Sequence, residues 1–353
     1  MRGWTAMLVA SAMGCGKLEA PPVEVHADAE VVVTDTEPAV DANVADAEAG
    51  ADAIAEVFGE TGGDADAVSD AGAAEADAGA IPSVVATGVL GPRGIAVGDG
   101  YAWVTSFGAP GIYRVPVTGG ATVKVASAVW PTYVATDATH VYWTDLAKPG
   151  APGSVGRVPI AGGPEQILAS GLAAPSSCAL FGGDVYVAEA FGRILAVPKA
   201  GGATATLASG GGHYAAANTT GVCWASDTAI RCVPHGGGVP TTLVDSEPLR
   251  VAALALDETR AFWVLRDGRV RTAAFADRLS STLADAVPGS ILAPDIALDG
   301  AHLYVVSGTT LRKIAKSGGV TPLASDPDQI WGVAVDATHV YWTAGSAVRR
   351  IAK

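Results

Sequence analysis

Residues 135–144 read ATDATHVYWT, and residues 334–343 read AVDATHVYWT. The two stretches differ at one position although 199 residues separate them, so they are two copies of one structural unit. In each copy an Asp-led turn precedes a run of β-branched and aromatic residues, which is the pattern of a strand that follows a tight turn. The chain therefore contains a β repeat.

The same unit recurs seven times from residue 84 onward. Aligned on one mostly aromatic position, the copies lie 37 to 44 residues apart, and each contains four short strand-like segments separated by turn residues. No segment has a sustained helical period. A period of about 40 residues with four strands is typical of a propeller blade, so we predict an all-β, seven-bladed β-propeller over residues 81–353. The aligned positions are Trp103, Tyr142, Tyr186, Cys223, Phe262, Tyr304 and Tyr341.

The two ends of this region are expected to complete one blade. Residues 348–351 supply the third strand of the seventh unit, and no fourth strand follows before Lys353. Residues 83–88 precede Pro92 much as residues 167–171 precede Pro175, which identifies them as the missing strand. We therefore expect the N- and C-terminal strands to pair and close the ring, which removes exposed sheet edges.

Recurrent polar residues in the repeat have a structural explanation. His140, His302 and His339 occupy one register in three different blades, so they do not converge on a metal. An Asp or Asn side chain in each turn is expected to accept hydrogen bonds from nearby N–H groups, and double glycines fit hairpin turns with positive φ better than phosphate loops. The turn residues are Asp137, Asn218, Asp257, Asp299 and Asp336, and the glycine pairs are Gly119-Gly120, Gly162-Gly163, Gly201-Gly202, Gly236-Gly237 and Gly318-Gly319.

Two cysteines bracket a predicted hairpin in the fourth unit. Cys223 and Cys232 then face each other across two strands, which favours a disulfide. A zinc site would need two further ligands. Cys178 aligns with apolar residues of other units, so we expect it to be buried.

The repeat resembles known propeller families. Residues 141–145 read VYWTD, which resembles the YWTD motif of the low-density-lipoprotein-receptor type of β-propeller, and residues 341–343 match the motif except for its Asp. Residues 91–97, GPRGIAV, resemble NHL and SMP-30/virginiamycin-lyase propellers. The resemblance covers residues 83–353 and implies a propeller fold, although YWTD propellers have six blades. A shared fold does not bring a function with it.

Negative charge is concentrated before the repeat. Of the 36 acidic residues, 17 lie between residues 19 and 80, where there is no Lys or Arg, and residues 81–353 hold 19 acidic and 20 basic side chains. The acidic stretch cannot bury enough apolar surface to fold, so we predict a disordered linker over residues 16–80. The sequence has no basic stripe for nucleic-acid phosphates and no apolar run of about 18 residues for a spanning helix.

The first 15 residues have the order of a secretory signal: Arg2, an apolar run over residues 4–13, and small residues before Cys15. Residues 12–15, AMGC, resemble the lipobox of bacterial lipoproteins, which implies lipidation of Cys15. A signal cleaved without lipidation and a start codon further upstream are the alternatives. We expect an exported protein in the cell envelope, on the outer-membrane, periplasmic or surface face, that touches the membrane through this lipid anchor alone.

Aromatic and charged residues gather in loops that a propeller places around its central channel. The loops that lead into the first strands and those between the second and third strands share one face. Their residue types are those of binding surfaces. The candidate ligand-binding residues at this channel mouth are Arg93, Trp130, Tyr133, His213, Tyr214, Arg250, Asp295 and Trp331, and the further loop residues are Phe107, Asp145, Lys148, Glu189, Phe191, Asp227, Arg266 and Gln329.

The sequence contains no nucleophile elbow, HExxH motif or paired carboxylates in the repeat region. It therefore favours a monomeric, envelope-tethered binding module for a protein, peptide or glycan partner, without a cofactor or metal. The alternative is a metal-assisted lyase or lactonase of the propeller type, with His213, Glu189 or Asp295 near a metal in the channel. A purely structural envelope component is the third reading.

Overall fold

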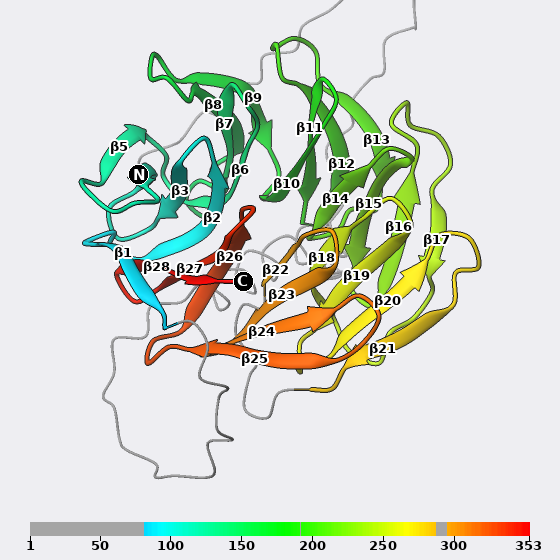
Figure 1. Ribbon diagram of the computed structural model, residues 1–353. Coiled ribbons are helices and arrows are strands. Elements are labelled where there is room, and N and C mark those ends of the chain that lie inside the picture. The colour runs from blue at the N-terminus through cyan, green and yellow to red at the C-terminus, as the bar shows by residue number, and fades with distance from the viewer. Residues whose placement is uncertain (1–80, 191, 287–294) are drawn as a thin grey trace, which may run out of the picture. The chain divides into compact units, whose positions relative to one another are not determined.

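The computed structural model describes residues 81–190, 192–286 and 295–353. The predicted signal peptide (1–15) and linker (16–80) lie outside the described residues and remain predictions. The described chain forms 28 strands in seven four-stranded antiparallel sheets, which surround a central axis as blades (Figure 1). The predicted seven-bladed β-propeller is therefore confirmed.

In each blade the first strand lies next to the axis and the fourth lies at the rim (Figure 1). Blade 1 contains β2 (Pro92–Gly98), β3 (Tyr101–Ser106), β4 (Gly111–Pro116) and β5 (Val123–Ala126). Blade 2 contains β6 (Pro131–Thr136), β7 (His140–Asp145), β8 (Gly153–Pro159) and β9 (Gln166–Leu172). Blade 3 contains β10 (Pro175–Phe181), β11 (Asp184–Glu189), β12 (Arg193–Pro198) and β13 (Ala205–Ser209). Blade 4 contains β14 (Ala215–Asn218), β15 (Gly221–Ser226), β16 (Ala229–Val233) and β17 (Thr241–Val244).

Three further blades complete the ring. Blade 5 contains β18 (Val251–Leu256), β19 (Arg260–Leu265), β20 (Val270–Ala274) and β21 (Ser280–Ala284). Blade 6 contains β22 (Asp295–Leu298), β23 (His302–Ser307), β24 (Thr310–Ala315) and β25 (Val320–Ser325). Blade 7 contains β26 (Ile330–Val335), β27 (His339–Ala344), β28 (Ala347–Ala352) and, as its outermost strand, β1 (Ser83–Thr87). The β1 strand pairs antiparallel with β28, Ser83 opposite Arg350 and Thr87 opposite Ala347, so the predicted closure is confirmed.

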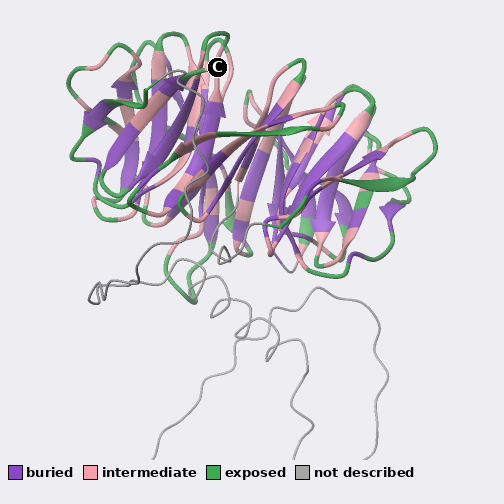
Figure 2. Cartoon of the chain, turned by 60° about the horizontal axis from the view of Figure 1, so that its bottom comes forward, coloured by how far each residue is buried: buried purple, intermediate pink, exposed green. Residues whose placement is uncertain are grey.

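The hydrophobic core lies between the blades. The aligned position falls on the second strand of every blade, and we call it the framework position; the residues there are at most 3% exposed. The buried side chains follow the strands, whereas exposure increases in the loops and at the rim (Figure 2). Packing of one sheet on the next therefore buries this position, which no blade could bury alone.

The turn between the first and second strands forms as predicted. In blade 2, Asp137 Oδ1 accepts the N–H groups of Thr139 at 2.9 Å and His140 at 3.0 Å, and Asp137 Oδ2 accepts the Tyr142 hydroxyl at 3.1 Å. Asp257, Asp299, Asp336 and Asn218 make equivalent bonds to the backbone. The histidine position contributes its backbone N–H to this turn, and in blade 5 Arg260 donates to Asp257 in the same way.

One predicted glycine pair is wrong by one residue. In blade 4, Gly237 and Gly238 have positive φ, in place of Gly236 and Gly237. The Gly237 N–H donates to the Pro234 carbonyl at 2.9 Å, and this fixes the turn one residue later than predicted. Three consecutive glycines offer no side chain that would distinguish the two registers.

The cysteine predictions for the described residues are confirmed. Cys223 and Cys232 are directly opposite each other on β15 and β16 and form a disulfide. Cys178 is a free, buried cysteine, and burial raises the pKa of its thiol to about 12. None of the described residues forms a helix with the length and hydrophobicity needed to cross a bilayer.

Candidate functional site

The candidate site lies where the loops before each first strand and the loops between second and third strands meet. Because the strands are antiparallel, these two sets of loops leave the sheets on the same face, around the mouth of the channel. We call it the channel-mouth face. The first strands of neighbouring blades contact one another around the ring, so side chains near their starts are brought together from distant parts of the sequence.

A row of stacked side chains crosses three blades on this face. The Arg93 guanidinium carbon lies 3.3 Å from the centre of the Trp331 ring and 5.1 Å from the centre of the Phe107 ring. Phe107 in turn stacks on Trp130, with ring centres 6.1 Å apart and an angle of 13° between the planes. We call these four residues the aromatic rail. It places a cation between two aromatic faces, an arrangement that strengthens as water is excluded.

Among the described tryptophans, the two of the rail are the ones that lie outside the hydrophobic core. Trp130 and Trp331 are partly exposed. The other five tryptophans in the described chain have no accessible surface; they are Trp103, Trp143, Trp224, Trp263 and Trp342. Burial lowers the pKa of the Arg93 guanidinium to about 10, which leaves it a cation at neutral pH. The rail thus presents partly exposed amphipathic rings, with a largely buried positive charge between two of them.

The loop that carries Trp130 is held by a buried carboxylate. Asp145, which is 7% exposed, accepts the N–H groups of Val129 and Trp130, each at 2.7 Å, and that of Ala147 at 3.0 Å. Three such bonds fix the backbone of both adjoining loops. Asp145 therefore positions the rail and has little capacity left to bind a ligand itself.

A second group combines His213 with two charged residues. An Arg250 N–H donates to His213 Nε2, and Arg250 Nε lies 3.1 Å from Asp227 Oδ1. Burial, together with the positive charge of Arg250, lowers the pKa of His213 to about 4. His213 is therefore neutral at pH 7 and accepts at Nε2. The Ser177 hydroxyl, which donates to the His213 carbonyl at 2.8 Å, holds the backbone of this loop.

Three candidate residues lie deeper, around the channel. Asp295 Oδ2 accepts the Val333 N–H at 3.0 Å, and burial raises the pKa of Asp295 to about 6. Burial raises the pKa of Tyr133 well above its ordinary value, and the nearby Asp295 carboxylate adds to the shift. The pKa of Tyr214 is raised for the same two reasons. Residues from blades 2, 4 and 6 therefore share one electrostatic environment, enclosed by the ring and partly open to the channel.

Glu189 is engaged in a local ion pair. Its side chain is 1% exposed, and its two oxygens accept Arg193 Nε at 2.8 Å and Arg193 Nη2 at 2.9 Å. Oε1 also accepts the Ala173 N–H at 2.8 Å. Glu189 is thus not brought together with Asp295 as a ligand pair, and within the described ranges no group of three or more His, Cys, Asp or Glu side chains is placed to hold a metal ion. Phe191 lies outside the described residues.

The repeat predicts which loops share this face, but not the contacts between their side chains. It places Phe107 among the further loop residues, but does not predict that this ring joins Arg93 to Trp130. Ser177 is not predicted either, because the repeat gives no reason to single it out. The only available signal for Phe107 was an aromatic residue in a loop between second and third strands, beside glycine and proline.

Comparisons with known proteins find the fold and no family. A scan against protein-family models and a search of the curated proteins found no match for this chain. Among solved structures, virginiamycin B lyase from Staphylococcus aureus has a TM-score of 0.65 at 14% identity, over 78% of this chain and 99% of that chain. The WD40 β-propeller domain of Doa1 has a TM-score of 0.62 at 13% identity, over 78% of this chain and 97% of that chain.

A third solved structure matches, YCF48 bound to a D1 peptide. Its TM-score is 0.58 at 9% identity, over 77% of this chain and 94% of that chain. At such identities the likeness shows the propeller fold alone. The neighbours include both an enzyme and a peptide-bound protein, so function has to be argued from the site.

Proposed function

We propose that this protein is an envelope-tethered binding module whose channel-mouth face holds a protein or peptide partner. The aromatic rail is the observation that carries the proposal. Tryptophan and arginine are the residue types that most often supply binding energy at protein interfaces, and here they are assembled before any partner arrives. A pre-assembled contact surface loses less conformational entropy on binding.

The position of the rail also supports this proposal. Its residues come from blades 7, 1 and 2, and the His213 and Arg250 group from blades 4 and 5 lies on the same face. A partner that reaches both groups would span the channel mouth. An extended peptide or a protruding loop has suitable dimensions, and side chains that stack on rings or accept from arginine would be favoured.

A binding experiment tests the proposal. We would crosslink the native envelope, identify partners by mass spectrometry, and repeat the capture with Trp130→Ala/Trp331→Ala and with Arg93→Ala/Arg250→Ala/Trp331→Ala. The expected result is loss of the captured partner with an intact fold by circular dichroism. The matched control is Val123→Ala/Ile167→Ala, which removes apolar groups 43% and 50% exposed at the rim of blades 1 and 2. Equal capture by all variants would exclude this face.

We infer in addition that the protein is exported and anchored through a lipidated Cys15. The disulfide supports export, because such bonds persist in oxidising compartments. Cys15→Ser should move the protein from the membrane fraction to the soluble fraction of the envelope and remove labelling by a palmitate analogue. Unchanged fractionation would contradict the anchor while leaving the binding proposal intact.

A metal-assisted lyase or lactonase is the second candidate. The observation that favours it is Asp295, whose pKa of about 6 suits proton transfer near neutral pH and which has Tyr133 and Tyr214 nearby. Metal analysis of the purified protein separates the two candidates. Stoichiometric Ca²⁺, Mg²⁺ or Zn²⁺ that is lost in Asp295→Asn would favour catalysis over simple binding.

A further inference from the structure

Neighbouring blades are joined by a recurrent contact on the face opposite the channel mouth. In this contact, the framework residue on the second strand of one blade lies against a side chain of the following blade. That side chain belongs to the residue directly after the third strand. Between blades 2 and 3, Lys199 Nζ lies 5.6 Å from the centre of the Tyr142 ring and 3.1 Å from Asp137 Oδ2. Between blades 6 and 7, Lys353 Nζ lies 5.6 Å from the Tyr304 ring and 2.8 Å from Asp299 Oδ2. An aromatic ring therefore occupies the space between the sheets.

The contact has variants that fill the same space. Between blades 3 and 4, the Tyr186 hydroxyl and His235 Nδ1 are 2.8 Å apart. Between blades 5 and 6, Lys316 Nζ lies 5.4 Å from the centre of the Phe262 ring. The chemistry of the second partner changes, but a ring from the framework position is present in each case.

A second long side chain often lies beside this ring. The residue that pairs with the framework position on the third strand is Arg157 in blade 2 and Arg350 in blade 7. Arg157 donates to the Lys199 carbonyl of blade 3, and Arg350 Nη1 donates to the Val117 carbonyl of blade 1 at 2.6 Å. The ring and the arginine together close the gap between two sheets.

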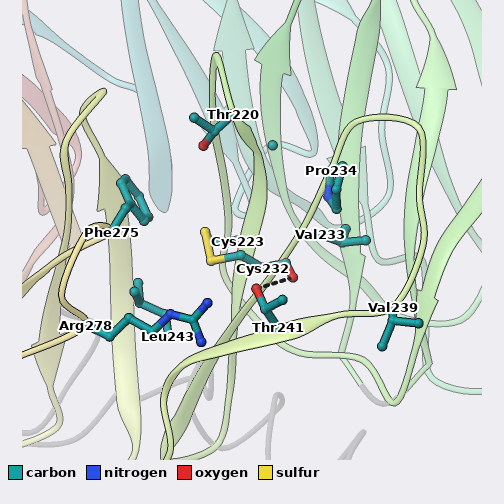
Figure 3. Close-up of a pocket in the computed structure, with 11 residues that line it drawn as sticks. Thr220, Cys223, Cys232, Val233, Pro234, Val239, Thr241, Leu243, Phe275 and Arg278 are labelled. Carbon is teal, nitrogen blue, oxygen red and sulfur yellow. Dashed lines mark hydrogen bonds between the residues drawn. A yellow bond between two sulfur atoms is a disulfide. The ribbon is translucent and has the colours of Figure 1, made fainter.

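The junction between blades 4 and 5 lacks both side chains. The framework residue of blade 4 is Cys223 and its third-strand partner is Cys232, and the two are consumed in one disulfide. The residue that follows the third strand of blade 5 is Phe275. Because the framework residue of blade 4 is a cysteine, there is no framework ring at this junction for Phe275 to contact. A pocket of about 310 Å³ lies here (Figure 3). Its lining residues are Thr220, Gly221, Cys223, Cys232, Val233, Pro234, Val239, Thr241, Leu243, Phe275 and Arg278.

The lining is apolar, with one positive charge at its edge. The disulfide lies in the centre, with Phe275 and Arg278 on one side and Val239 on the other (Figure 3). Sulfur against an aromatic ring is a favourable contact. Val239 is 86% exposed, so an apolar surface continues out of the pocket. Among the described lining residues Arg278 alone is charged, and it is exposed; the hydrogen bond from its Nη1 to the Thr242 carbonyl is long, at 3.4 Å.

We propose that the pocket between blades 4 and 5 binds a small aromatic group that carries a carboxylate or another anionic substituent. The aromatic class follows from the other junctions, where a ring from the framework position fills the equivalent space. The volume fits, because a cavity of about 150 Å³ holds a benzene ring, and the excess leaves room for the substituent. The anionic substituent is the complement of Arg278. The inference does not depend on the channel-mouth proposal, because the pocket is lined by strands of blade 4 and by turns and loops of the opposite face.

Calorimetric titration of the purified full-length chain tests this site. The probes are 3-(4-hydroxyphenyl)propanoate and its uncharged counterpart p-cresol, and we expect saturable one-to-one binding of both, with the carboxylate binding more tightly. Arg278→Ala should weaken the carboxylate probe about two- to fivefold, the range of an exposed ion pair, and leave p-cresol unchanged. No saturable binding of either probe to the native chain would overturn the proposal.

Two disulfide variants locate the binding. Cys223→Tyr/Cys232→Arg rebuilds the pair found in blade 2 and should abolish binding of both probes, whereas Cys223→Ala/Cys232→Ala keeps the space open and should retain it. If the first variant fails to fold, Cys223→Phe/Cys232→Thr copies the Phe262 and Thr272 pair of blade 5 and serves the same purpose. Undiminished binding in a filled variant would overturn the site. Phe58 is the one Phe, Tyr or Trp in the predicted linker (16–80). Binding that appears only in Phe58→Ala would also overturn the proposal, since the chain's own ring would then be the occupant.

Discussion

The Thr343 hydroxyl donates a hydrogen bond of 2.7 Å to the Arg93 carbonyl. Thr343 is on the second strand of blade 7 and Arg93 on the first strand of blade 1, so this bond crosses the junction between these two blades. The same hydroxyl accepts the Gly332 N–H at 3.0 Å and has no accessible surface. The buried Thr343 side chain thereby fixes the backbone of Arg93, the cation at the centre of the aromatic rail.

Thr343→Val should destabilise the protein by about 1–3 kcal/mol, because valine preserves the shape but leaves a buried N–H and a buried carbonyl without the hydroxyl. Denaturant unfolding monitored by tryptophan fluorescence gives the free energy of unfolding. Thr343→Ser, which keeps the hydroxyl, is the control and should lose less. A valine variant as stable as the native chain would show that the bond carries no net energy.

Removal of residues 347–353 should unfold the whole ring. Without β28, β1 loses its only pairing partner and β27 becomes an edge strand, and the core between blades 7 and 1 loses Val348. We expect loss of the near-ultraviolet circular dichroism of all blades together, and aggregation. Persistence of a cooperative transition with most of its amplitude would mean that the blades fold independently of closure.

Asp295 should make stability fall as pH rises through its titration range. Its pKa is about 6 in the folded protein against 3.8 for an exposed Asp. Between these values the folded state binds more protons than the unfolded state, so stability decreases with rising pH and then levels off. The difference in melting temperature between Asp295→Asn and the native chain should therefore increase from pH 4 to pH 6. A difference that stays constant over this interval would contradict the assignment.

Titration of His213 should make the stability of the protein fall as pH decreases, the opposite of the effect of Asp295. Its pKa is about 4 when folded against 6.5 when exposed, so the unfolded state binds more protons between these values and stability is lost as pH falls from 6.5 to 4. His213→Gln keeps an acceptor for Arg250 and has no titration, so it should be less sensitive to acid. Identical pH profiles of the variant and the native chain would refute this prediction.

Loss of the disulfide should weaken the protein without opening the ring. The loop between Cys223 and Cys232 spans a sequence separation of 9, and the loss of its closure entropy corresponds to about 2–3 kcal/mol. Cys223→Ala/Cys232→Ala should therefore fold with a lower melting temperature. Addition of reductant should lower the melting temperature of the native chain by a similar amount and leave the variant unchanged.

The architecture could be predicted from the sequence because blades, turns and ring closure each leave a recognisable pattern in the repeat. Spacing of the framework position predicts the blades, Asp137 and its equivalents predict the turns, and the strand at residues 83–88 predicts the closure. The spacing and the turns rest on local chemistry that recurs from blade to blade, and the closing strand was found by comparison with the fourth strand of another unit. The glycine pair of blade 4 was predicted one residue too early because three glycines follow one another there, and none of them has a side chain that would tell the two positions of the turn apart.

The contacts within the site could not be predicted in the same way. Arg93 and Trp331 meet because blades 1 and 7 are neighbours, but which ring stacks on which cation depends on loop conformations that the repeat does not specify. The pocket is a similar case. Cys223 in an aromatic register was visible in the sequence, whereas the space it leaves depends on Phe275 and Arg278 in the following blade.

The pairing of β1 with β28 also has a consequence for biosynthesis. Among the described strands β1 is synthesised first and β28 last, so the seventh sheet cannot be completed until residues 347–352 have been made. Until then the nascent chain lacks its final sheet and remains open. This order fits the export proposed above, because the chain would still be open when it passes through a membrane pore and would close its ring on the far side.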